Sequence, residues 1–206
     1  AYWRYETAIR TAEGRTGSVM GATGAIYAIH RELFPRDLPP ETILDDVYVP
    51  MTAVLAGWRV AYAEDAVAHD RELDVGREFV RKVRTLAGNW QLLWLLPQLS
   101  NPLAGRAQWR FFWHKTARLL CPAALAIAFV GSLTAPGLAA SAALAAQAIL
   151  YGLAAIASIA PRRAGRVAAL CLTFVALNAA AVAGCFAWAR GRAGVVWVRT
   201  GELGTS

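Results

Sequence analysis

Two adjacent carboxylates, Asp45 and Asp46, are the side chains of this sequence best suited to acid–base chemistry. They follow a loop rich in proline and precede an apolar segment, residues 47–56, that ends at Gly57 as a helix with a C-terminal glycine does. A carboxylate at such a helix start, beside a polar substrate, can serve as a general base. The same placement also suits a helix N-cap with a neighbouring surface acid, because the helix dipole favours negative charge there. Spacing alone leaves both interpretations open.

A pair of arginines one helical turn apart, Arg81 and Arg84, is the second candidate for chemistry. Guanidinium groups at positions i and i+3 can bond the oxygens of a diphosphate. A basic face turned to solvent or to lipid headgroups has the same spacing and is the more common arrangement. The pair therefore predicts a phosphate site only if other motifs support it.

The arginines belong to a segment, residues 75–99, with the periodicity of an amphipathic helix. Its apolar residues recur at three- and four-residue spacing and include Phe79, Val83, Leu86, Trp90, Leu93 and Trp94. An apolar face with tryptophan beside a basic face predicts a helix that lies in the membrane interface. An amphipathic helix packed on a protein core is the alternative.

The carboxylates belong to a different kind of region, in which short strand and helix signals alternate. Strands are expected at residues 25–29, 58–62 and 66–69, and a short helical turn at residues 30–34. This mixed α/β pattern covers residues 1–75, which is too short for a complete nucleotide-binding domain of about 100–150 residues.

Two long stretches, residues 119–161 and 167–189, contain no Asp, Glu, Lys or Arg. Because a bilayer core is crossed by about 20 apolar residues in a helix, we predict membrane spans at 117–134, 138–160 and 167–189. Basic residues flank these spans, as they do in cytoplasmic loops that face anionic lipid. The third span would then leave three arginines outside, against that tendency, so a re-entrant or interfacial segment is an alternative. These arginines are Arg190, Arg192 and Arg199.

The chain therefore divides into an α/β part (1–75), amphipathic interfacial helices (76–116), transmembrane helices (117–190) and a C-terminal tail (191–206). Its net charge is +7, but the positive residues cluster beside apolar segments and no nucleic-acid-reading module is visible, so nucleic acid is not expected as a partner. The cysteines lie in the apolar segments without metal-ligand spacing, so no metal site is expected within this chain.

Several motifs occur together, and their order resembles that of membrane-bound bacterial glycosyltransferases of family 2, the group of the cellulose, hyaluronan and poly-N-acetylglucosamine synthases. Each motif is weak alone, but the ordered set covers nearly the whole chain. The matching segments are the glycine-rich Gly21-Ala22-Thr23-Gly24-Ala25 and its continuation to Arg31, Asp45-Asp46 at the Glu-Asp element, the strand and turn from Gly57 to Ala66, Phe79 to Thr85 at the Gln-x-x-Arg-Trp element, and Trp113 to Arg118 before the first span.

The resemblance implies the C-terminal half of a GT-A (Rossmann-like) domain, followed by an interfacial helix and about three transmembrane helices. It implies an inverting enzyme of the cell (inner) membrane, with its catalytic part cytoplasmic, that moves a sugar from a nucleotide-sugar, expected to be a UDP-sugar, to a glycan or lipid-linked acceptor. Asp46 would be the catalytic base, Asp45 would orient it, and Arg84 would steady the leaving diphosphate. The remaining residues expected to bind substrate are Gly21, Thr23, Gly24, Ala25 and Arg81.

Two departures from the family pattern limit these expectations. Thr85 stands where processive members carry tryptophan, which puts polymer synthesis in doubt. The chain also contains no Asp-x-Asp, the family element that holds a divalent metal (Mg or Mn) and the donor diphosphate. The metal ligands and the donor-binding half are therefore expected upstream, and this piece alone is expected to be inactive.

Two other classes of protein fit parts of the pattern. A non-catalytic membrane scaffold, or a degenerate homologue of such an enzyme, would keep the spans and lose the chemistry. A transporter would carry ionisable residues within its spans. Here the polar residues of the spans are Gln147, Asn178, serines and threonines, which disfavours transport.

Overall fold

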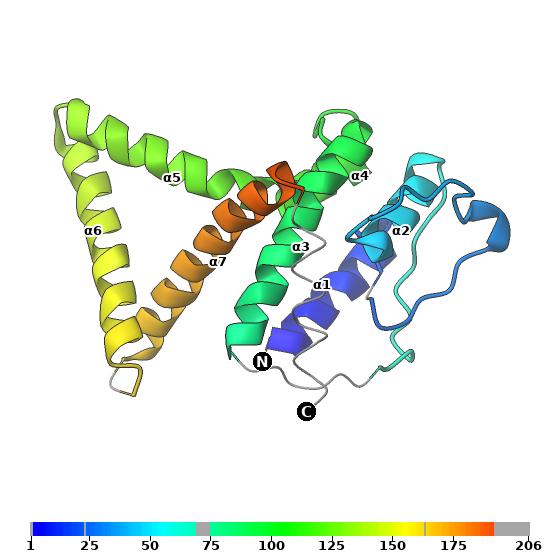
Figure 1. Cartoon of the computed structure of the whole chain (residues 1–206), viewed down its shortest axis with the longest axis horizontal. Coiled ribbons are helices and arrows are strands. Elements are labelled where there is room, and N and C mark those ends of the chain that lie inside the picture. The colour runs from blue at the N-terminus through cyan, green and yellow to red at the C-terminus, as the bar shows by residue number, and fades with distance from the viewer. Residues whose placement is uncertain (1, 23, 69–74, 163, 192–206) are drawn as a thin grey trace.

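A computed structural model describes residues 2–22, 24–68, 75–162 and 164–191, and this part of the chain is mostly helical. Two helices, α1 (Tyr2–Thr16) and α2 (Asp45–Leu55), lie in the N-terminal part, with a 3-10 turn η1 (Arg31–Leu33) between them. The long helix α3 (Val75–Leu95) lies between this part and the apolar helices (Figure 1). The expected helices at 47–56 and 75–99 and the turn at 30–34 are therefore confirmed.

The expected strands, by contrast, are not formed within the described residues, so the prediction of a mixed α/β half-domain is wrong there. The reason lies in the pairing of the segments. Val19 N–H donates to Val60 O at 3.1 Å, but Val60 N–H bonds the side-chain Oγ of Ser18 at 3.1 Å instead of a second carbonyl. A strand needs a repeating backbone ladder, so the segment around Val60 remains an extended loop. In the segment 25–29, Ile26 forms an isolated bridge and not a strand. His69, at the end of the third expected strand, lies outside the described residues.

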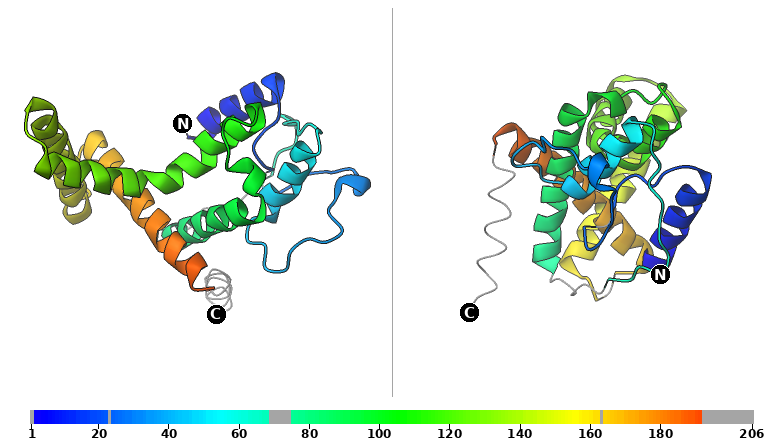
Figure 2. Two further views of the ribbon diagram at one scale, coloured as in Figure 1. Left: turned by 90° about the horizontal axis from the view of Figure 1, so that it is seen from above. Right: turned by 90° about the vertical axis from the view of Figure 1, so that its right-hand side faces the viewer.

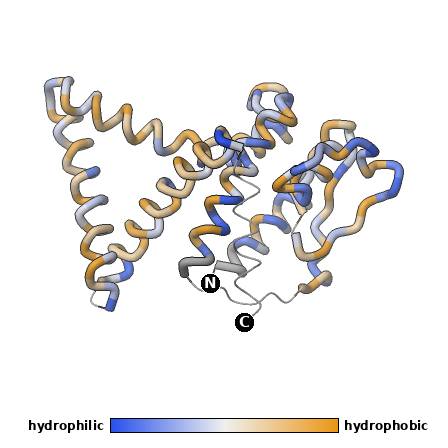
Figure 3. Tube along the Cα trace, in the orientation of Figure 1, coloured by the Kyte–Doolittle hydropathy of each residue, from blue (hydrophilic) through white to orange (hydrophobic). Residues whose placement is uncertain are grey.

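Three helices in the described part of the chain are long and apolar enough to cross a membrane. The first runs from Arg106 to Thr134 and comprises α4 (Arg106–Phe111), a π-helical turn η3 (Phe112–Thr116) and α5 (Ala117–Thr134). The others are α6 (Leu138–Ile159) and α7 (Arg166–Ala189). Most of the trace of these helices is hydrophobic (Figure 3), and many of their large apolar side chains are exposed, as helices in contact with lipid require. The three predicted spans are confirmed in length and composition.

The links between these helices are short. Ala135, Pro136 and Gly137 join α5 to α6, and Gly137 has a φ of +111°, which glycine adopts without strain. Seen from above, α5 and α6 extend away from the N-terminal helices, while α7 returns toward them (Figure 2). The third span therefore brings the chain back to α3.

Helix α3 packs closely on α7 through small residues. A Cβ added at Gly184 of α7 would lie 2.8 Å from the backbone nitrogen of Ala87 and 3.0 Å from the carbonyl oxygen of Val83, both in α3. Ala180 and Ala181 pack beside Leu86, which is 2% exposed. Small residues let two helix backbones approach in this way.

The apolar stripe of α3 thus has a protein partner. Val83, Leu86 and Trp90 face α7, and Trp90 stacks on Trp188 with ring centroids 6.5 Å apart. Phe79 and Trp94 remain exposed. The contacts match the interpretation of an amphipathic helix on a protein core, while the exposed aromatic side chains at its two ends suit a membrane interface.

The helical hairpins predict where the loops lie relative to the bilayer. Cysteines introduced at Ala135 and Gly165 are expected to react with a membrane-impermeant maleimide from opposite sides, because α6 separates them and is long enough to span. Gly165 has open space around a new side chain. The native Cys121, Cys171 and Cys185 should stay protected inside the spans. Labelling of both positions from one side would show that α6 does not cross.

Candidate functional site

Asp45 and Asp46 form the first turn of α2. The N-cap position is Leu44, and no side chain caps the helix, so neither carboxylate serves as the N-cap. Asp45 is exposed, whereas Asp46 is half-buried. The two acids are therefore distinguished by their surroundings.

The glycine-rich segment lies directly on this first turn. Ala22 N–H donates to the carbonyl oxygen of Asp46 at 2.8 Å. A Cβ on Gly24 would lie 3.1 Å from Asp46 Oδ2, and one on Gly21, which has a φ of +120°, would lie 3.0 Å from Val47 Cγ2. A side chain at either position would crowd this turn, and the φ of Gly21 is one that glycine adopts without strain. The structure thus brings Gly24 to Asp46 and Gly21 to the adjoining Val47. Ala25 follows in an exposed turn, and Thr23 lies outside the described residues.

Helix α3 holds the chain just before the carboxylates. Arg84 Nη2 donates to Ile43 O at 3.2 Å, and Gln91 Oε1 accepts from Ile43 N–H at 2.8 Å. Gln91 Nε2 also donates to the carbonyl oxygen of Glu41 at 3.0 Å. Glu41 has a φ of +63°, a conformation that a side chain other than glycine adopts rarely. Gln91 thus stabilises the bend from which α2 begins.

The segment before α2 approaches α3 most closely at Gly88. A Cβ there would lie 2.5 Å from Leu44 Cγ, so only glycine lets Leu44 pack onto the helix. Sequence reasoning missed both Gly88 and Gln91. They lie four and seven residues after Arg84, so the three residues share one face of the helix. That spacing is the signal that could have found them.

The two arginines of the expected diphosphate pair have different partners. Arg81 bonds Glu78, with Nη2 2.8 Å from Oε2, and both side chains are well exposed. Arg84 reaches toward the start of α2, and its positive charge offsets part of the rise that burial causes in the pKa of Asp46. Of the two, Arg84 is the arginine that belongs to the surroundings of the carboxylates.

The electrostatic surroundings of Asp46 suit a base. Burial is the largest effect and raises the pKa of Asp46; the positive charge of Lys115 opposes it, and the negative charge of Asp45 adds to it. Burial, followed by the charges of Asp45 and Asp46, also raises the pKa of Tyr27. Sequence reasoning placed Tyr27 in a strand and Lys115 in a basic flank, so it missed both as neighbours of the site.

The raised pKa of Asp46 predicts how stability depends on pH. Because the folded protein holds the Asp46 proton more tightly than the unfolded chain, wild-type stability falls as pH rises from about 4 through the folded-state pKa. Asp46→Asn removes this penalty, so the variant is expected to have a higher melting temperature than wild type at pH 7. The difference should shrink toward pH 4.

Thermal unfolding of the detergent-solubilised chain at both pH values checks this expectation. Asp45→Asn, at an exposed position of the same helical turn, is the control and should change the melting temperature less. A pH-independent difference between Asp46→Asn and wild type would show that Asp46 is not held in a partly desolvated place.

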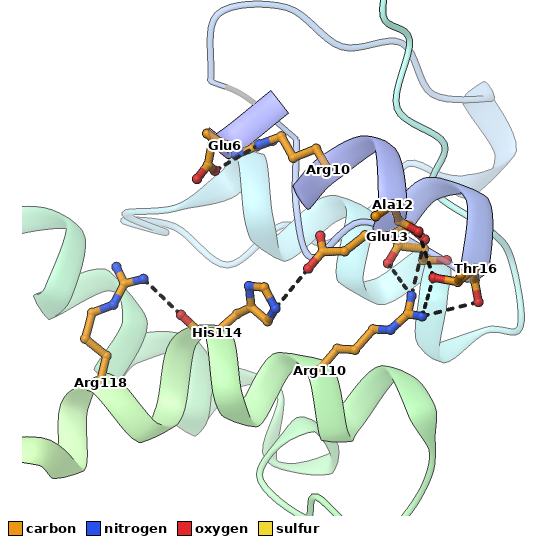
Figure 4. A network of polar contacts seen from close by, with 9 residues as sticks. Glu6, Arg10, Ala12, Glu13, Thr16, Arg110, His114 and Arg118 are labelled. Atoms are coloured by element: carbon orange, nitrogen blue, oxygen red, sulfur yellow. Dashed lines mark hydrogen bonds and ion pairs between the residues drawn. The ribbon is translucent and has the colours of Figure 1, made fainter. Parts of the chain in front are cut away.

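Two arginines bond the backbone of the segment between α1 and the glycine-rich segment. Arg110 of α4 donates to the carbonyl oxygens of Glu13 at 3.2 Å and Thr16 at 3.3 Å, and to Thr16 Oγ1 at 2.7 Å (Figure 4). Arg59 Nε donates to Gly17 O at 2.8 Å. A Cβ at Gly17 would lie 2.7 Å from Arg110 Nη1, so a larger residue there would displace the Arg110 guanidinium.

A further contact joins α1 to the beginning of the first span. His114 Nε2 of η3 lies 3.0 Å from Glu13 Oε1 (Figure 4). Together with Arg110, this contact fixes the C-terminal end of α1 on the helix that continues into the membrane. The position of the glycine-rich loop, and hence the surroundings of Asp46, therefore depend on the start of the first span.

The described residues include no group of three or more His, Cys, Asp or Glu side chains that could hold a metal ion. No protein-family model, curated protein or solved structure matches this chain.

Proposed function

We propose that this chain is the acceptor side of a membrane-anchored, inverting glycosyltransferase, in which Asp46 is the catalytic base. The observation that carries the proposal is the juxtaposition of the half-buried Asp46 carboxylate with Gly24, where no side chain blocks an approaching hydroxyl group. Burial raises the pKa of Asp46. A base whose pKa lies closer to neutral accepts a proton more readily from a weakly acidic hydroxyl group.

In the proposed reaction, an acceptor oxygen attacks the anomeric carbon of a nucleotide-sugar, expected to be a UDP-sugar. The bond from that carbon to the diphosphate breaks, and the nucleoside diphosphate leaves with the bonding electron pair. The hydroxyl proton of the acceptor passes to Asp46 Oδ2, and the configuration at the anomeric carbon inverts. Gly21 and Gly24 admit the acceptor, and Asp45 contributes negative charge that keeps Asp46 basic.

The complete enzyme would need a divalent metal, Mg or Mn, to neutralise the leaving diphosphate. Its ligands are expected upstream of this chain, so no step is assigned to it here. Membrane lipids are the expected surroundings of the three apolar helices, and a glycan or a lipid-linked acceptor would reach the site beside them. We place the carboxylates on the cytoplasmic side of the cell (inner) membrane, where nucleotide-sugars are available.

Arg84→Lys is expected to impair the complete enzyme more than Arg81→Lys does. Lysine keeps the charge but loses the planar fork that can bond two phosphate oxygens. Losing one charge-assisted bond of about 1.5–3 kcal/mol corresponds to roughly 10–150-fold in donor binding or turnover. Arg81 is the matched control, because it lies one turn away and its described partner is Glu78.

Donor affinity and turnover measured for both variants, together with their melting temperatures, test this proposal. The melting temperature separates a lost phosphate contact from the loss of the Arg84 bond to Ile43 O. Small and equal effects of the two substitutions on donor binding would remove Arg84 from the proposed phosphate site.

A further inference from the structure

The interface between α3 and the start of the first span contains two buried polar side chains without hydrogen-bond partners among the described residues. Asn89 is 1% exposed, and neither its Nδ2 nor its Oδ1 is bonded. Thr116 is 6% exposed, and its Oγ1 is not bonded. Buried polar atoms are nearly always satisfied in native proteins, since leaving one unpaired is costly. These atoms therefore need a partner that the described chain does not supply.

Thr116 is unlike the other hydroxyl-bearing residues of the neighbouring helices. Every serine and threonine of α3, α5, α6 and α7 donates back to a carbonyl oxygen of its own helix; these are Thr85, Ser132, Thr134, Ser141, Ser158 and Thr173. Thr116 ends the π-helical turn η3. Such turns insert one extra residue and occur frequently at functional sites.

Asn89 also differs from the comparable residue of the spans. Asn178 of α7 satisfies its amide nitrogen by donating to Phe174 O at 2.9 Å. Asn89 makes no such bond, although a helical backbone surrounds it in the same way. Both amide atoms of Asn89 are thus available to a bound group.

Asn89 in α3 and Thr116 in η3 each lie between residues of the same two apolar clusters. In α3, Asn89 lies three residues after Leu86 and three residues before Leu92. Leu86 packs in one apolar cluster with Leu119, and Leu92 packs in another with Phe111. Thr116 lies between Phe111 and Leu119 on the other side, so the two polar residues fall between the same two clusters.

Asn89 and Thr116 are each adjacent in sequence to a residue connected with the candidate site. Lys115 immediately precedes Thr116, and its charge acts on the Asp46 carboxylate. Asn89 immediately follows Gly88, on which Leu44 packs. Asn89 and Thr116 thus each adjoin, along the chain, a residue that packs against the start of α2 or acts on its charge.

We propose that Asn89 and Thr116 bind a hydroxyl group of the acceptor, in the interior between α3 and η3. The proposal rests on the proposed function, because it assigns this group to the molecule whose other hydroxyl gives its proton to Asp46. A hydroxyl both donates and accepts, which matches the Oδ1 acceptor, the Nδ2 donor and the Thr116 hydroxyl. Both side chains are neutral, so a hydroxyl-bearing sugar fits them better than an anion does. A single internal water molecule has the same hydrogen-bonding chemistry.

Binding of n-octyl β-glucoside, below its micellar concentration, to the full chain in lipid nanodiscs tests the proposal. Its tetra-O-methyl derivative is the matched ligand, because it lacks hydroxyl donors and keeps the same alkyl chain. Wild type is expected to bind the glucoside about 30-fold more tightly, as the gain of about two ordinary hydrogen bonds predicts. Asn89→Leu and Thr116→Val, which nearly keep side-chain size, should each reduce this preference severalfold. Asn178→Leu is the control and should leave it unchanged.

The outcomes separate the possible partners of the two side chains. No preference in wild type, with melting temperatures changed in both variants, would mean that internal water alone occupies the site and would overturn the proposal. A preference that survives in both folded variants would also overturn it. If one variant fails to fold, the other decides. This experiment measures binding and not sugar transfer. Its result therefore does not depend on whether Asp46 is the catalytic base.

Discussion

Asp46→Asn is expected to reduce sugar transfer by the complete enzyme by about 10²–10⁴-fold, the usual contribution of a general base. Asparagine nearly keeps the size of the side chain, so the close contact of Gly24 with this residue should persist. It has no basic carboxylate to accept the acceptor proton. Donor affinity should remain near that of wild type, since Asp46 lies on the acceptor side in the proposed reaction.

Turnover and donor binding of the membrane-extracted protein test this expectation, with Asp45→Asn as the control. Asp45 is exposed and adjoins the same helical turn, so its substitution should have the smaller effect. Near-normal turnover in Asp46→Asn would remove Asp46 from the base role. Activity lost only in Asp45→Asn would assign that role to Asp45.

Gly184→Val is expected to cause the largest loss of stability among the substitutions considered, about 2–3 kcal/mol or more. A Cβ at this position of α7 would lie 2.8 Å from the backbone nitrogen of Ala87. Backbone atoms have no alternative rotamer to adopt, so the two helices must separate. Because α3 also carries Arg84 and Gln91, which bond Ile43, the separation should disturb the start of α2 as well.

Gly131→Val in α5 is the matched control for this substitution. It introduces the same side chain into an apolar helix, but nothing lies within 4 Å of the new Cβ. Denaturant unfolding in mixed micelles compares the two variants with wild type. Equal stability of the two valine variants would show that α3 does not pack closely on α7.

The spans and the long amphipathic helix were predictable because their signals are local. The absence of charge over residues 119–161 marks α5 and α6, and the spacing of Leu86 and Trp90 marks α3; neither signal depends on a partner elsewhere in the chain. The strands at 25–29 and 58–62 failed for the opposite reason. Strand formation depends on a partner elsewhere in the chain. In the segment 58–62, Val60 N–H bonds a side-chain hydroxyl where a second rung would be, and in the segment 25–29 only Ile26 forms a bridge.

The candidate site was predictable in part. The motif order placed Gly24 and Asp46 in one site, and the structure brings them into contact. Lys115 was missed because it comes from a segment far from Asp46 in the sequence, and Tyr27 because the local pattern predicts a buried strand around it. Gly184 was also missed, because the sequence of an apolar helix does not indicate which of its small residues contacts the backbone of another helix.

The most direct test of the central claim is the formation of nucleoside diphosphate from UDP-sugars by membranes that contain the complete protein. We predict that a panel of UDP-sugars includes one donor that is converted to UDP, with the sugar transferred to an acceptor with inverted anomeric configuration. Membranes with Asp46→Asn should form UDP at the background rate. Equal UDP formation with the wild type and with Asp46→Asn would contradict the claim that this carboxylate drives sugar transfer.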